Sequence, residues 1–362
     1  MDYGECFSEM ITKKGIDEVI AGYNSKKLTV CTLGSHSALQ IAKGARDEGL
    51  PNLLICTKKN SAFYKEWPVV DEVLTVDAYK DVLSEKVQEK LREKNAILVP
   101  HGSFVEYVGA SNIREKLNVP MVGSRVVLEW ESDRKKQFKW LKDAGARLPR
   151  EYMSPEEIDR LVIVKFPGAK GGAGYFLANS GGEYKFKMNH VNLPDSVKAE
   201  CMIQEYIVGT RFYPHFFYSP LNDSLQLLGM DIRYESNVDG LSRIPKNANI
   251  EPSYVVTGNI PVVMRESLLP GLMDLGRNVV AASKRLFSPG MLGPFCLEMV
   301  CTQDLEFICF EVSARIVAGT NVFINGSPYS SLLYDEPMSC GRRISREIKD
   351  AATRKKLGAI LY

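Results

Sequence analysis

Near its C-terminus the chain reads Phe295-Cys-Leu-Glu-Met-Val300, then Cys301-Thr-Gln-Asp304, then Leu305-Glu-Phe-Ile-Cys-Phe-Glu311. The two apolar runs are typical of β-strands, and the polar residues between them predict a hairpin that turns near Gln303 and Asp304. A two-residue turn pairs Glu298 with Cys309, and Glu311 then becomes the diagonal neighbour of Glu298 on the same sheet face. A shift of one residue in this register would send the two carboxylates to opposite faces.

Two carboxylates on one face of an apolar hairpin indicate a metal site. An ionised carboxylate is unfavourable in an apolar environment unless a cation compensates its charge. Mg²⁺ is commonly held between a few carboxylates and the phosphates of a substrate, so Glu298 and Glu311 are candidate metal ligands. The hairpin alone leaves a second interpretation open, in which both glutamates are solvated on an exposed face.

Composition limits the class of protein. The 362 residues are enough for two or three domains. The 46 Lys and Arg nearly balance the 44 Asp and Glu, which argues against binding to nucleic acid or to an anionic membrane over the whole surface. None of the eight cysteines forms Cys-x-x-Cys, and the sequence shows neither a signal peptide nor an apolar run of membrane-spanning length. We expect a cytoplasmic protein with reduced thiols.

The first 125 residues alternate between strand and helix patterns. Strands are predicted at 27–33, 52–57, 72–76 and 96–100, with a fifth candidate at 119–122, and helices at 37–48 and 82–94. This alternation predicts a Rossmann-like α/β domain with a parallel sheet. The pattern then changes to a helix at 128–144, a helix that begins after Ser154, and antiparallel strands from Leu161. We therefore expect three domains, at 1–125, 126–210 and 211–362, with α+β character in the later two.

Two predicted parallel strands end in similar polar tips, Gly34-Ser-His36 and His101-Gly-Ser103. Ligands of parallel α/β sheets bind at the carboxyl ends of the strands, where small residues let backbone N–H groups approach a phosphate. Histidine and serine side chains add hydrogen-bond donors. The tips therefore favour a ligand site over ordinary turns with solvated histidines.

A glycine-rich loop, Pro167-Gly-Ala-Lys-Gly-Gly-Ala-Gly174, connects two predicted strands. It has no Gly-Lys-Ser/Thr, and no helix follows it, so it is neither a P-loop nor a dinucleotide fingerprint. A strand–loop–strand flap of this kind lies over nucleotide phosphates, and Lys165 before it would reach them as a point charge. A flexible hairpin is the alternative interpretation.

The run Met202-Ile-Gln-Glu-Tyr-Ile-Val-Gly209 predicts a strand that ends at an inter-domain hinge. The backbone of such a hinge can pair with the edge of an adenine, and its carboxylate can accept hydrogen bonds from ribose hydroxyls. An edge strand with polar residues facing water is the other interpretation.

In their order, these parts resemble the ATP-grasp superfamily, which has an α/β domain, a phosphate flap, a hinge and two acidic metal ligands. More narrowly, the chain resembles the archaeal formate-dependent synthetases that make 5-formaminoimidazole-4-carboxamide ribonucleotide (FAICAR) from the 5-amino compound (AICAR). The resemblance covers nearly the whole chain. Its most specific motifs are Thr32-Leu-Gly-Ser-His-Ser37, Val99-Pro-His-Gly-Ser-Phe104, Val162-Ile-Val-Lys-Phe-Pro-Gly-Ala169, Glu205-Tyr-Ile-Val-Gly-Thr210, Arg233-Tyr-Glu-Ser-Asn237, Thr257-Gly-Asn-Ile-Pro261 and Glu311-Val-Ser-Ala-Arg315.

This resemblance implies a carbon–nitrogen ligase that uses ATP and Mg²⁺ or Mn²⁺ to activate formate as formyl phosphate. It also implies that the protein assembles as a homo-oligomer, either a trimer or a hexamer. It implies a role for each candidate site residue. The substrate ligands would be His36, Ser103 and Asn259. The ATP ligands would be Lys165, Gly171, Gly172, Gly174, Gln204, Glu205, Tyr206, Ile207 and Glu235. The metal ligands would be Glu298 and Glu311, and the catalytic cations would be Lys165 and Arg315.

Three positions leave the substrate open. Val317 and Ala318 stand where some family members have an acid and a glycine, and Ala173 stands where an arginine is familiar. An ATP-grasp paralogue that joins another small carboxylate to another amino-ribonucleotide is therefore the main alternative. A nucleotide-binding regulator without turnover is a weaker alternative, because Lys165, Glu298 and Glu311 are intact. A purely structural α/β protein is also weaker, because it would not explain the flap together with the acidic hairpin.

Overall fold

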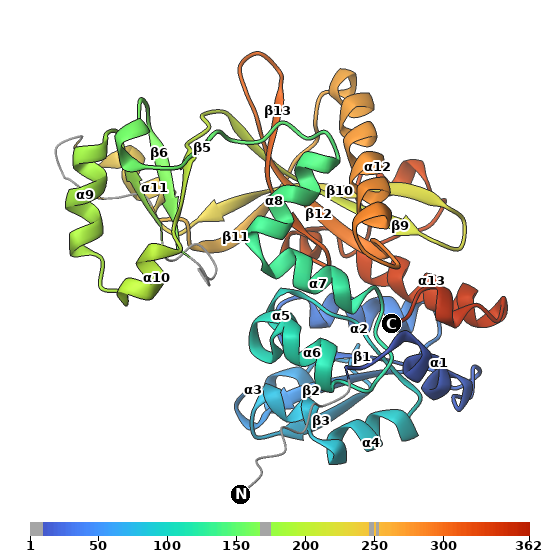
Figure 1. Cartoon of the computed structure of the whole chain (residues 1–362). Coiled ribbons are helices and arrows are strands. Elements are labelled where there is room, and N and C mark those ends of the chain that lie inside the picture. Colours follow the sequence, from blue (N-terminus) through green and yellow to red (C-terminus); the bar gives the residue numbers. More distant parts are fainter. Residues whose placement is uncertain (1–9, 167–174, 246–249, 251–252) are drawn as a thin grey trace, which may run out of the picture.

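The computed structural model describes residues 10–166, 175–245, 250 and 253–362. Three sheets organise these residues (Figure 1). An N-terminal parallel sheet has the strand order β3-β2-β1-β4, and two antiparallel sheets have the orders β5-β8-β6-β7 and β11-β10-β9-β12-β13. A parallel sheet followed by antiparallel sheets is the arrangement that the sequence predicts.

The parallel sheet consists of β1 (Thr29–Leu33), β2 (Asn52–Thr57), β3 (Glu72–Val76) and β4 (Ala96–Leu98). Its helices are α1 (Lys13–Ala21), α2 (Ala38–Asp47), α3 (Lys58–Lys65), α4 (Glu85–Glu93), α5 (Gly102–Val108) and α6 (Ala110–Lys116), with a 3₁₀ turn, η1 (Tyr79–Leu83). Strands β1, β2 and β4 are almost entirely buried, as their continuous apolar runs require. The fifth strand candidate is wrong, because Met121 and Val122 form only isolated bridges, to Leu98 and Leu361.

The smaller antiparallel sheet lies at the upper left of Figure 1. It contains β5 (Glu151–Tyr152), β6 (Val162–Lys165), β7 (Tyr175–Ala178) and β8 (Met202–Glu205), with η2 (Pro155–Glu157), α9 (Gly181–His190) and α10 (Asp195–Ala199). We call this unit the lid.

Two helix predictions need correction. The single helix expected at 128–144 is two helices, α7 (Arg125–Ser132) and α8 (Arg134–Asp143), because Asp133 caps α8 by accepting from the backbone N–H groups of Lys135 and Lys136. The helix expected after Ser154 is only the 3₁₀ turn η2, and the Ser154 side chain makes no capping hydrogen bond.

The central sheet consists of β9 (Thr210–Ser219), β10 (Ser224–Glu235), β11 (Val256–Pro261), β12 (Gly293–Cys301) and β13 (Phe307–Ser313). Helices α11 (Val238–Arg243), α12 (Leu269–Leu286) and α13 (Cys340–Thr353) follow its strands, with η3 (Glu266–Leu268), η4 (Ala318–Phe323), η5 (Ser330–Leu332) and η6 (Leu357–Ala359).

The two faces of the central sheet have opposite character. On one face, Phe216, Leu297 and Val312 belong to a core that includes Val279 of α12 and Trp140 of α8. On the other face, which we call the polar face, strand alternation and cross-strand register place Tyr213, His215, Asp231, Arg233, Asn259, Glu298 and Glu311. The predicted site residues of this sheet therefore share one surface.

The acidic hairpin keeps both carboxylates on one face, but its register differs from the prediction. Its strands end at Cys301 and begin at Phe307, and Cys301 pairs with Phe307 because Leu305, at φ 60°, adds one residue to the turn. A β-bulge on β13 then adds a second residue, Phe310, because Met299 pairs with Cys309 and Glu298 pairs with Glu311. Two one-residue shifts restore the face, so Glu298 lies directly opposite Glu311 instead of diagonally.

Helix α13 joins the C-terminal part of the chain to the parallel sheet. A Cβ on Gly44 of α2 would lie 2.2 Å from the backbone of Gly341 and Arg342, so the two helices cross with their backbones nearly in contact. Ile41 and Ala45 pack in one cluster with Ile344 and Ile348. The domain boundaries expected near 125 and 210 stay predictions. Among the helices of the described ranges, none is long and apolar enough to cross a membrane.

This close crossing predicts a steric effect on stability. Gly44→Ala places a methyl group against the α13 backbone and should lower the free energy of unfolding by about 1–3 kcal/mol, as measured by urea denaturation. Gly271→Ala in α12 is the matched control, because nothing lies within 4 Å of its Cβ position. The control should be neutral or slightly stabilising. Equal unfolding midpoints for the two variants would contradict the close crossing.

Candidate active site

The two polar strand tips meet through their histidines. The His36 ring stacks on the His101 ring, with centroids 5.1 Å apart and an interplanar angle of 6°. His101 is fully buried, and its Nε2 donates to the Leu33 carbonyl while its Nδ1 accepts from the Phe104 backbone N–H, which caps α5. Burial and the nearby Arg315 charge lower the pKa of His101 to about 4. His101 is thus a neutral structural residue, and it supports His36.

His36 and Arg315 converge on the start of α5. A Cβ on Gly102 would lie 2.9 Å from His36 Nε2 and 3.3 Å from the Arg315 guanidinium, so both groups border this glycine. Burial, the His101 ring and the charges of Arg315 and Arg233 lower the pKa of His36 to about 2, which keeps its ring neutral. Ser103 is the next residue of α5 and is partly buried. The structure therefore brings together the predicted substrate ligands of the two tips and the predicted catalytic arginine.

Glu298 is buried and its charge is compensated. Its side chain is 2 % exposed, and both of its carboxylate oxygens accept from the guanidinium of Arg233, one of them at 2.7 Å. The Ser313 hydroxyl donates to the same carboxylate at 3.1 Å, and the guanidinium of Arg233 lies 4.1 Å from the centre of the Tyr213 ring. The interpretation of Glu298 as a solvated residue is therefore wrong.

Glu311 differs from Glu298, because its carboxylate has no hydrogen bond or ion pair in the part of the chain that the structure describes. Burial and the Glu298 charge raise its pKa to about 7, against the opposing charges of Lys165, Arg233 and Arg134. Lys165, at the end of β6 in the lid, is 8 % exposed, and burial lowers its pKa to about 8 while Glu311 opposes this shift. The lid thus brings a lysine to the carboxylates of the central sheet.

These residues fit a metal ion that takes its other ligands from a substrate. The described residues contain no group of three or more His, Cys, Asp or Glu side chains that could hold a metal by themselves. Glu298 and Glu311 supply two opposed carboxylates, and the oxygens of Glu311 have no partner among the residues that the structure describes. Mg²⁺ and Mn²⁺ accept such oxygen ligands together with phosphate oxygens and water.

The predicted nucleotide residues lie mostly on the lid. Gln204 is buried in β8, and its Oε1 has no hydrogen-bond partner among the described residues. Glu205 accepts from Arg160 at 3.1 Å, and the backbone N–H of Tyr206 already donates to the Leu161 carbonyl. Ile207 follows and is partly buried. Among the described residues, the buried Gln204 oxygen is thus a hinge acceptor without a partner.

Glu235 and three glycines of the flap complete the predicted nucleotide residues. Glu235 ends β10 and forms a two-point ion pair with Arg211 of β9, with Nη2 to Oε2 at 3.0 Å. Gly171, Gly172 and Gly174 lie outside the described residues.

Asn259 joins the polar face from the edge strand β11. It is the direct cross-strand neighbour of Arg233, and its Nδ2 donates to Oδ2 of the buried Asp231 at 2.7 Å. Val317 is buried against Tyr213 and Cys296, so its side chain packs on the polar face, and its carbonyl accepts from the Ser37 hydroxyl at 3.4 Å. Ala318 begins η4. The structure thus places Val317 between the polar face and the His36 tip, whereas Ala173, the third departure from the family pattern, lies outside the described residues.

Sequence analysis missed three charged residues of the site. Arg233 compensates Glu298, and the alternation of Asp231, Arg233 and Glu235 along β10 is a period-two signal that could have revealed it. Arg134 acts on Lys165 and Glu311, and Glu131 forms an ion pair with Arg315 at 3.2 Å. Both lie on helices whose charge predicts only a solvated surface, so no local signal marks them.

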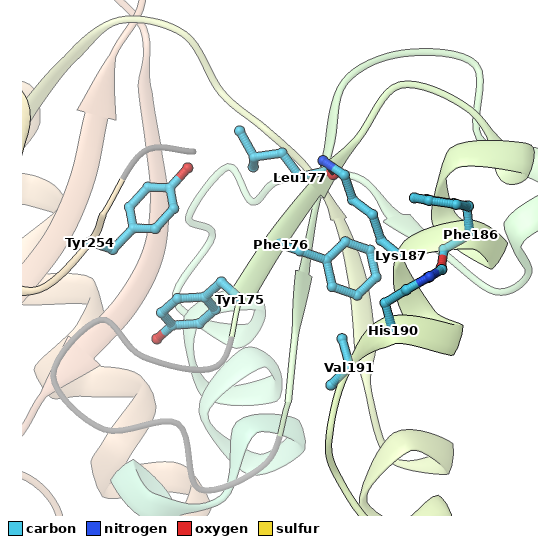
Figure 2. A pocket seen from close by; sticks show the side chains of 8 residues that line it. All are labelled: Tyr175, Phe176, Leu177, Phe186, Lys187, His190, Val191 and Tyr254. Carbon is cyan, nitrogen blue, oxygen red and sulfur yellow. Dashed lines mark hydrogen bonds between the residues drawn. The ribbon is translucent and has the colours of Figure 1, made fainter. Parts of the chain in front are cut away.

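A separate pocket lies at the outer edge of the lid sheet. It is lined by Tyr175, Phe176, Leu177, Phe186, Lys187, His190, Val191 and Tyr254 (Figure 2). Figure 2 shows the rings of Tyr175 and Tyr254 on one side and the side chains of α9 on the other. The two tyrosine rings meet edge to face at 5.9 Å. None of the predicted site residues within the described ranges lines this pocket.

Comparison with known proteins defines the family. The chain is 51% identical over 350 residues to the 5-formaminoimidazole-4-carboxamide-1-(beta)-D-ribofuranosyl 5'-monophosphate synthetase of Methanocaldococcus jannaschii, covering 94% of this chain and 97% of the relative. It is 47% identical over 360 residues to the synthetase of the same name from Methanothermobacter thermautotrophicus, covering 97% of this chain and 99% of the relative. The chain belongs to the FAICAR synthetase family. The family predicted from sequence is confirmed.

Two family models match parts of the chain. The model described as "Protein of unknown function (DUF1246)" matches residues 30–152, and the one described as "Domain of unknown function (DUF1297)" matches residues 184–362. Together they cover most of the α/β domain and the central sheet, and they leave residues 153–183 of the lid unmatched.

Solved structures confirm the ATP-grasp fold of this FAICAR synthetase family member. An IMP biosynthesis protein, PurP, from Thermococcus kodakaraensis is similar with a TM-score of 0.74 and 32% identity, over 92% of this chain and all of that one. The N5-carboxyaminoimidazole synthetase of Staphylococcus aureus, solved with ADP, is similar with a TM-score of 0.64 at 14% identity, over 90% of this chain and 79% of that one. The second likeness concerns the fold alone.

The buried His101 predicts an acid-sensitive stability. Because its pKa of about 4 in the folded protein lies below the ordinary value of 6.5, the unfolded chain binds the proton more tightly. The stability that depends on neutral His101 is complete above pH 6.5 and is lost as the pH falls toward 4. His101→Asn keeps a capping side chain but does not titrate there. Between pH 7 and 5 the wild type should lose on the order of 2 kcal/mol more stability than the variant in urea denaturation. Parallel curves for the two proteins would contradict this.

Proposed function

We propose that the protein is an ATP- and formate-dependent ligase that formylates the 5-amino group of AICAR to FAICAR in IMP biosynthesis. Its near full-length identity to synthetases with this name carries the proposal. The site geometry supports it, because strand tips, a lysine from the lid and an acidic pair meet around Arg233 and Arg315.

In the first step, a formate oxygen attacks the γ-phosphorus of ATP, the bond to the bridging oxygen breaks, and formyl phosphate and ADP result. The chain contributes position and charge to this step. Lys165, Arg233 and Arg315 place positive charge around the transferring phosphoryl group, where it stabilises the transition state. Burial of Lys165 strengthens this effect, since water screens its charge less.

Mg²⁺ or Mn²⁺, held by Glu298 and Glu311, would neutralise charge on the phosphates of ATP. Glu311 suits this role because its carboxylate keeps its oxygens for an incoming cation. Burial and the Glu298 charge raise the pKa of Glu311, and a bound cation would favour its ionised form.

In the second step, the 5-amino nitrogen of AICAR attacks the formyl carbon, the carbon–oxygen bond to phosphate breaks, and the released phosphate takes the amine proton. His36, Ser103 and Asn259 would hold the nucleotide for this attack. The proximity of His36 to Arg315 supports this, since the tips and the phosphoryl site then share one arginine. Formyl phosphate reacts readily with water, so a site that excludes water favours the amine.

The remaining assignments follow the family pattern. Lys165, Gly171, Gly172 and Gly174 would bind the ATP phosphates, Gln204, Glu205, Tyr206 and Ile207 the adenine end, and Glu235 the same nucleotide. A homo-oligomer, either a trimer or a hexamer, and a cytoplasmic location stay predictions.

The activity predicts release of ADP that needs both formate and AICAR, with a product that carries one formyl group. Lys165→Met removes a buried cation at the phosphates, and we expect kcat to fall roughly 10²–10³-fold. A coupled ADP assay together with mass spectrometry of the product measures this. Lys86→Met, on the exposed face of α4, is the control and should keep wild-type kcat. ADP release that ignores formate and AICAR, or that accepts another carboxylate in place of formate, would overturn the proposed reaction.

Metal dependence tests the acidic pair. EDTA should abolish activity, and added Mg²⁺ should restore it. Glu311→Gln should raise the Mg²⁺ concentration for half-maximal activity by about tenfold or more, because an amide is a weaker ligand than a carboxylate. Glu306→Gln, on the turn of the same hairpin, is the matched control, since its carboxylate is exposed and binds Arg147. If both variants show the wild-type Mg²⁺ requirement, Glu311 is not a metal ligand.

A further inference from the structure

A buried histidine–carboxylate pair lies in the polar face beside the proposed site, and the reaction described above does not use it. His215 of β9 and Asp231 of β10 are 2 % and 1 % exposed. The Nε2 of His215 donates to Oδ1 of Asp231 at 2.8 Å. Buried groups of this kind need a specific arrangement of partners, because desolvation is unfavourable for each of them.

The second oxygen of Asp231 is also occupied. It accepts from Asn259 Nδ2 at 2.7 Å. The backbone of Gly319 in η4 closes over the same carboxylate, since a Cβ on Gly319 would lie 2.2 Å from Oδ1 and 2.7 Å from Oδ2. The carboxylate is therefore fixed from three directions, by a histidine, an amide and a main-chain segment.

This arrangement sets the orientation of the Asn259 amide. An ionised carboxylate can only accept hydrogen bonds, so the amide must turn its NH₂ group toward Asp231. The carbonyl oxygen of Asn259 then faces the other way, and it can only accept. The carbonyl oxygen of Asn259 is therefore available to accept a hydrogen bond from a ligand on the side of the amide away from Asp231.

Asn259 borders the proposed substrate site. Its cross-strand neighbour Arg233 binds Glu298, and the charge of the same arginine acts on His36. The Asn259 amide thus lies on the same sheet face as Glu298 and Glu311. It is next to Arg233, which binds Glu298 and whose charge acts on His36.

We propose that His215 and Asp231 are positioning residues that hold Asn259 with its carbonyl oxygen toward the acceptor nucleotide, where it accepts a hydrogen bond from an exocyclic N–H group. The inference rests on the proposed function, in which the acceptor is AICAR. Asn259 then selects nucleotides that carry an N–H donor at this place, because a nucleotide with a carbonyl there would put two acceptors together.

An exchange of side chains tests the inference. Asp231→Asn alone removes the fixed acceptor for the amide, and Asn259→Asp alone sets two carboxylates against each other. Each should raise the KM for AICAR about tenfold or more, with the KM for ATP nearly unchanged. In the double variant D231N/N259D, the amide at position 231 donates to the carboxylate at position 259 and still accepts from His215. The outer oxygen at position 259 again faces the nucleotide, so the KM for AICAR should recover to within about threefold of the wild type.

Asn259→Ala gives a test that does not depend on the buried pair, since position 259 lies on an edge strand and is only partly buried. It should raise the KM for AICAR by a similar factor without changing inhibition by inosine monophosphate, which shares the ribose phosphate but has no exocyclic N–H. Ile260→Thr is the matched control, because Ile260 is 45 % exposed and points to the opposite face of the same strand.

The outcomes separate the two proposals. A wild type that formylates AICAR, together with an Asn259→Ala variant of unchanged KM for AICAR, overturns the inference and leaves the proposed function intact. An equal loss of affinity for inosine monophosphate also overturns it, because Asn259 then reads a part that both nucleotides share. A wild type that gives no formylated product with AICAR overturns both proposals.

Discussion

The ion pair between Arg233 and Glu298 is the interaction on which the site depends. Burying Glu298 alone in a sheet would be strongly unfavourable, and the two-point contact with Arg233 removes most of that penalty. Burial opposes the charge of Arg233, but Glu298 and Tyr213 outweigh it and raise the arginine pKa. The same charge helps to keep His36 neutral and limits the rise in the pKa of Glu311. The charge of one arginine therefore acts on both the strand tip and the proposed metal ligands.

The geometry of the acidic hairpin places Glu298 on the polar face, where it can bind Arg233. Two one-residue shifts, at the turn and at the bulge, bring Glu298 directly opposite Glu311. The alternation of the strands then leaves Leu297 and Val312 for the core under α12 and α8. One hairpin thus serves both the packing of the central sheet and the chemistry of its polar face. A single shift would have buried one carboxylate in that core.

The sequence predicts these features unequally, for physical reasons. Strands at 52–57 and 72–76 were predicted at both ends, because each is an apolar run with polar boundaries. The shared face of Glu298 and Glu311 was predicted but their register was not, since the positive φ of Leu305 and the bulge leave no mark on the hydrophobic pattern. Asp133 divides a continuous helical pattern through a cap. Arg233 was not predicted as a site residue because its partner Glu298 lies two strands away in the sheet, on β12, and no local sequence pattern relates the two residues.

The proposed site combines parts that are distant in the sequence, namely Lys165 of the lid, the strand tips and the polar face. In the proposed reaction these parts have complementary roles. In the proposed function, formate receives a phosphoryl group before AICAR reacts. Formate labelled with heavy oxygen tests this most directly, by mass spectrometry of the phosphate released in the presence of ATP and AICAR. A formyl phosphate route transfers one formate oxygen to phosphate, so the phosphate should carry the label once for each FAICAR formed. Unlabelled phosphate accompanying FAICAR would contradict the account.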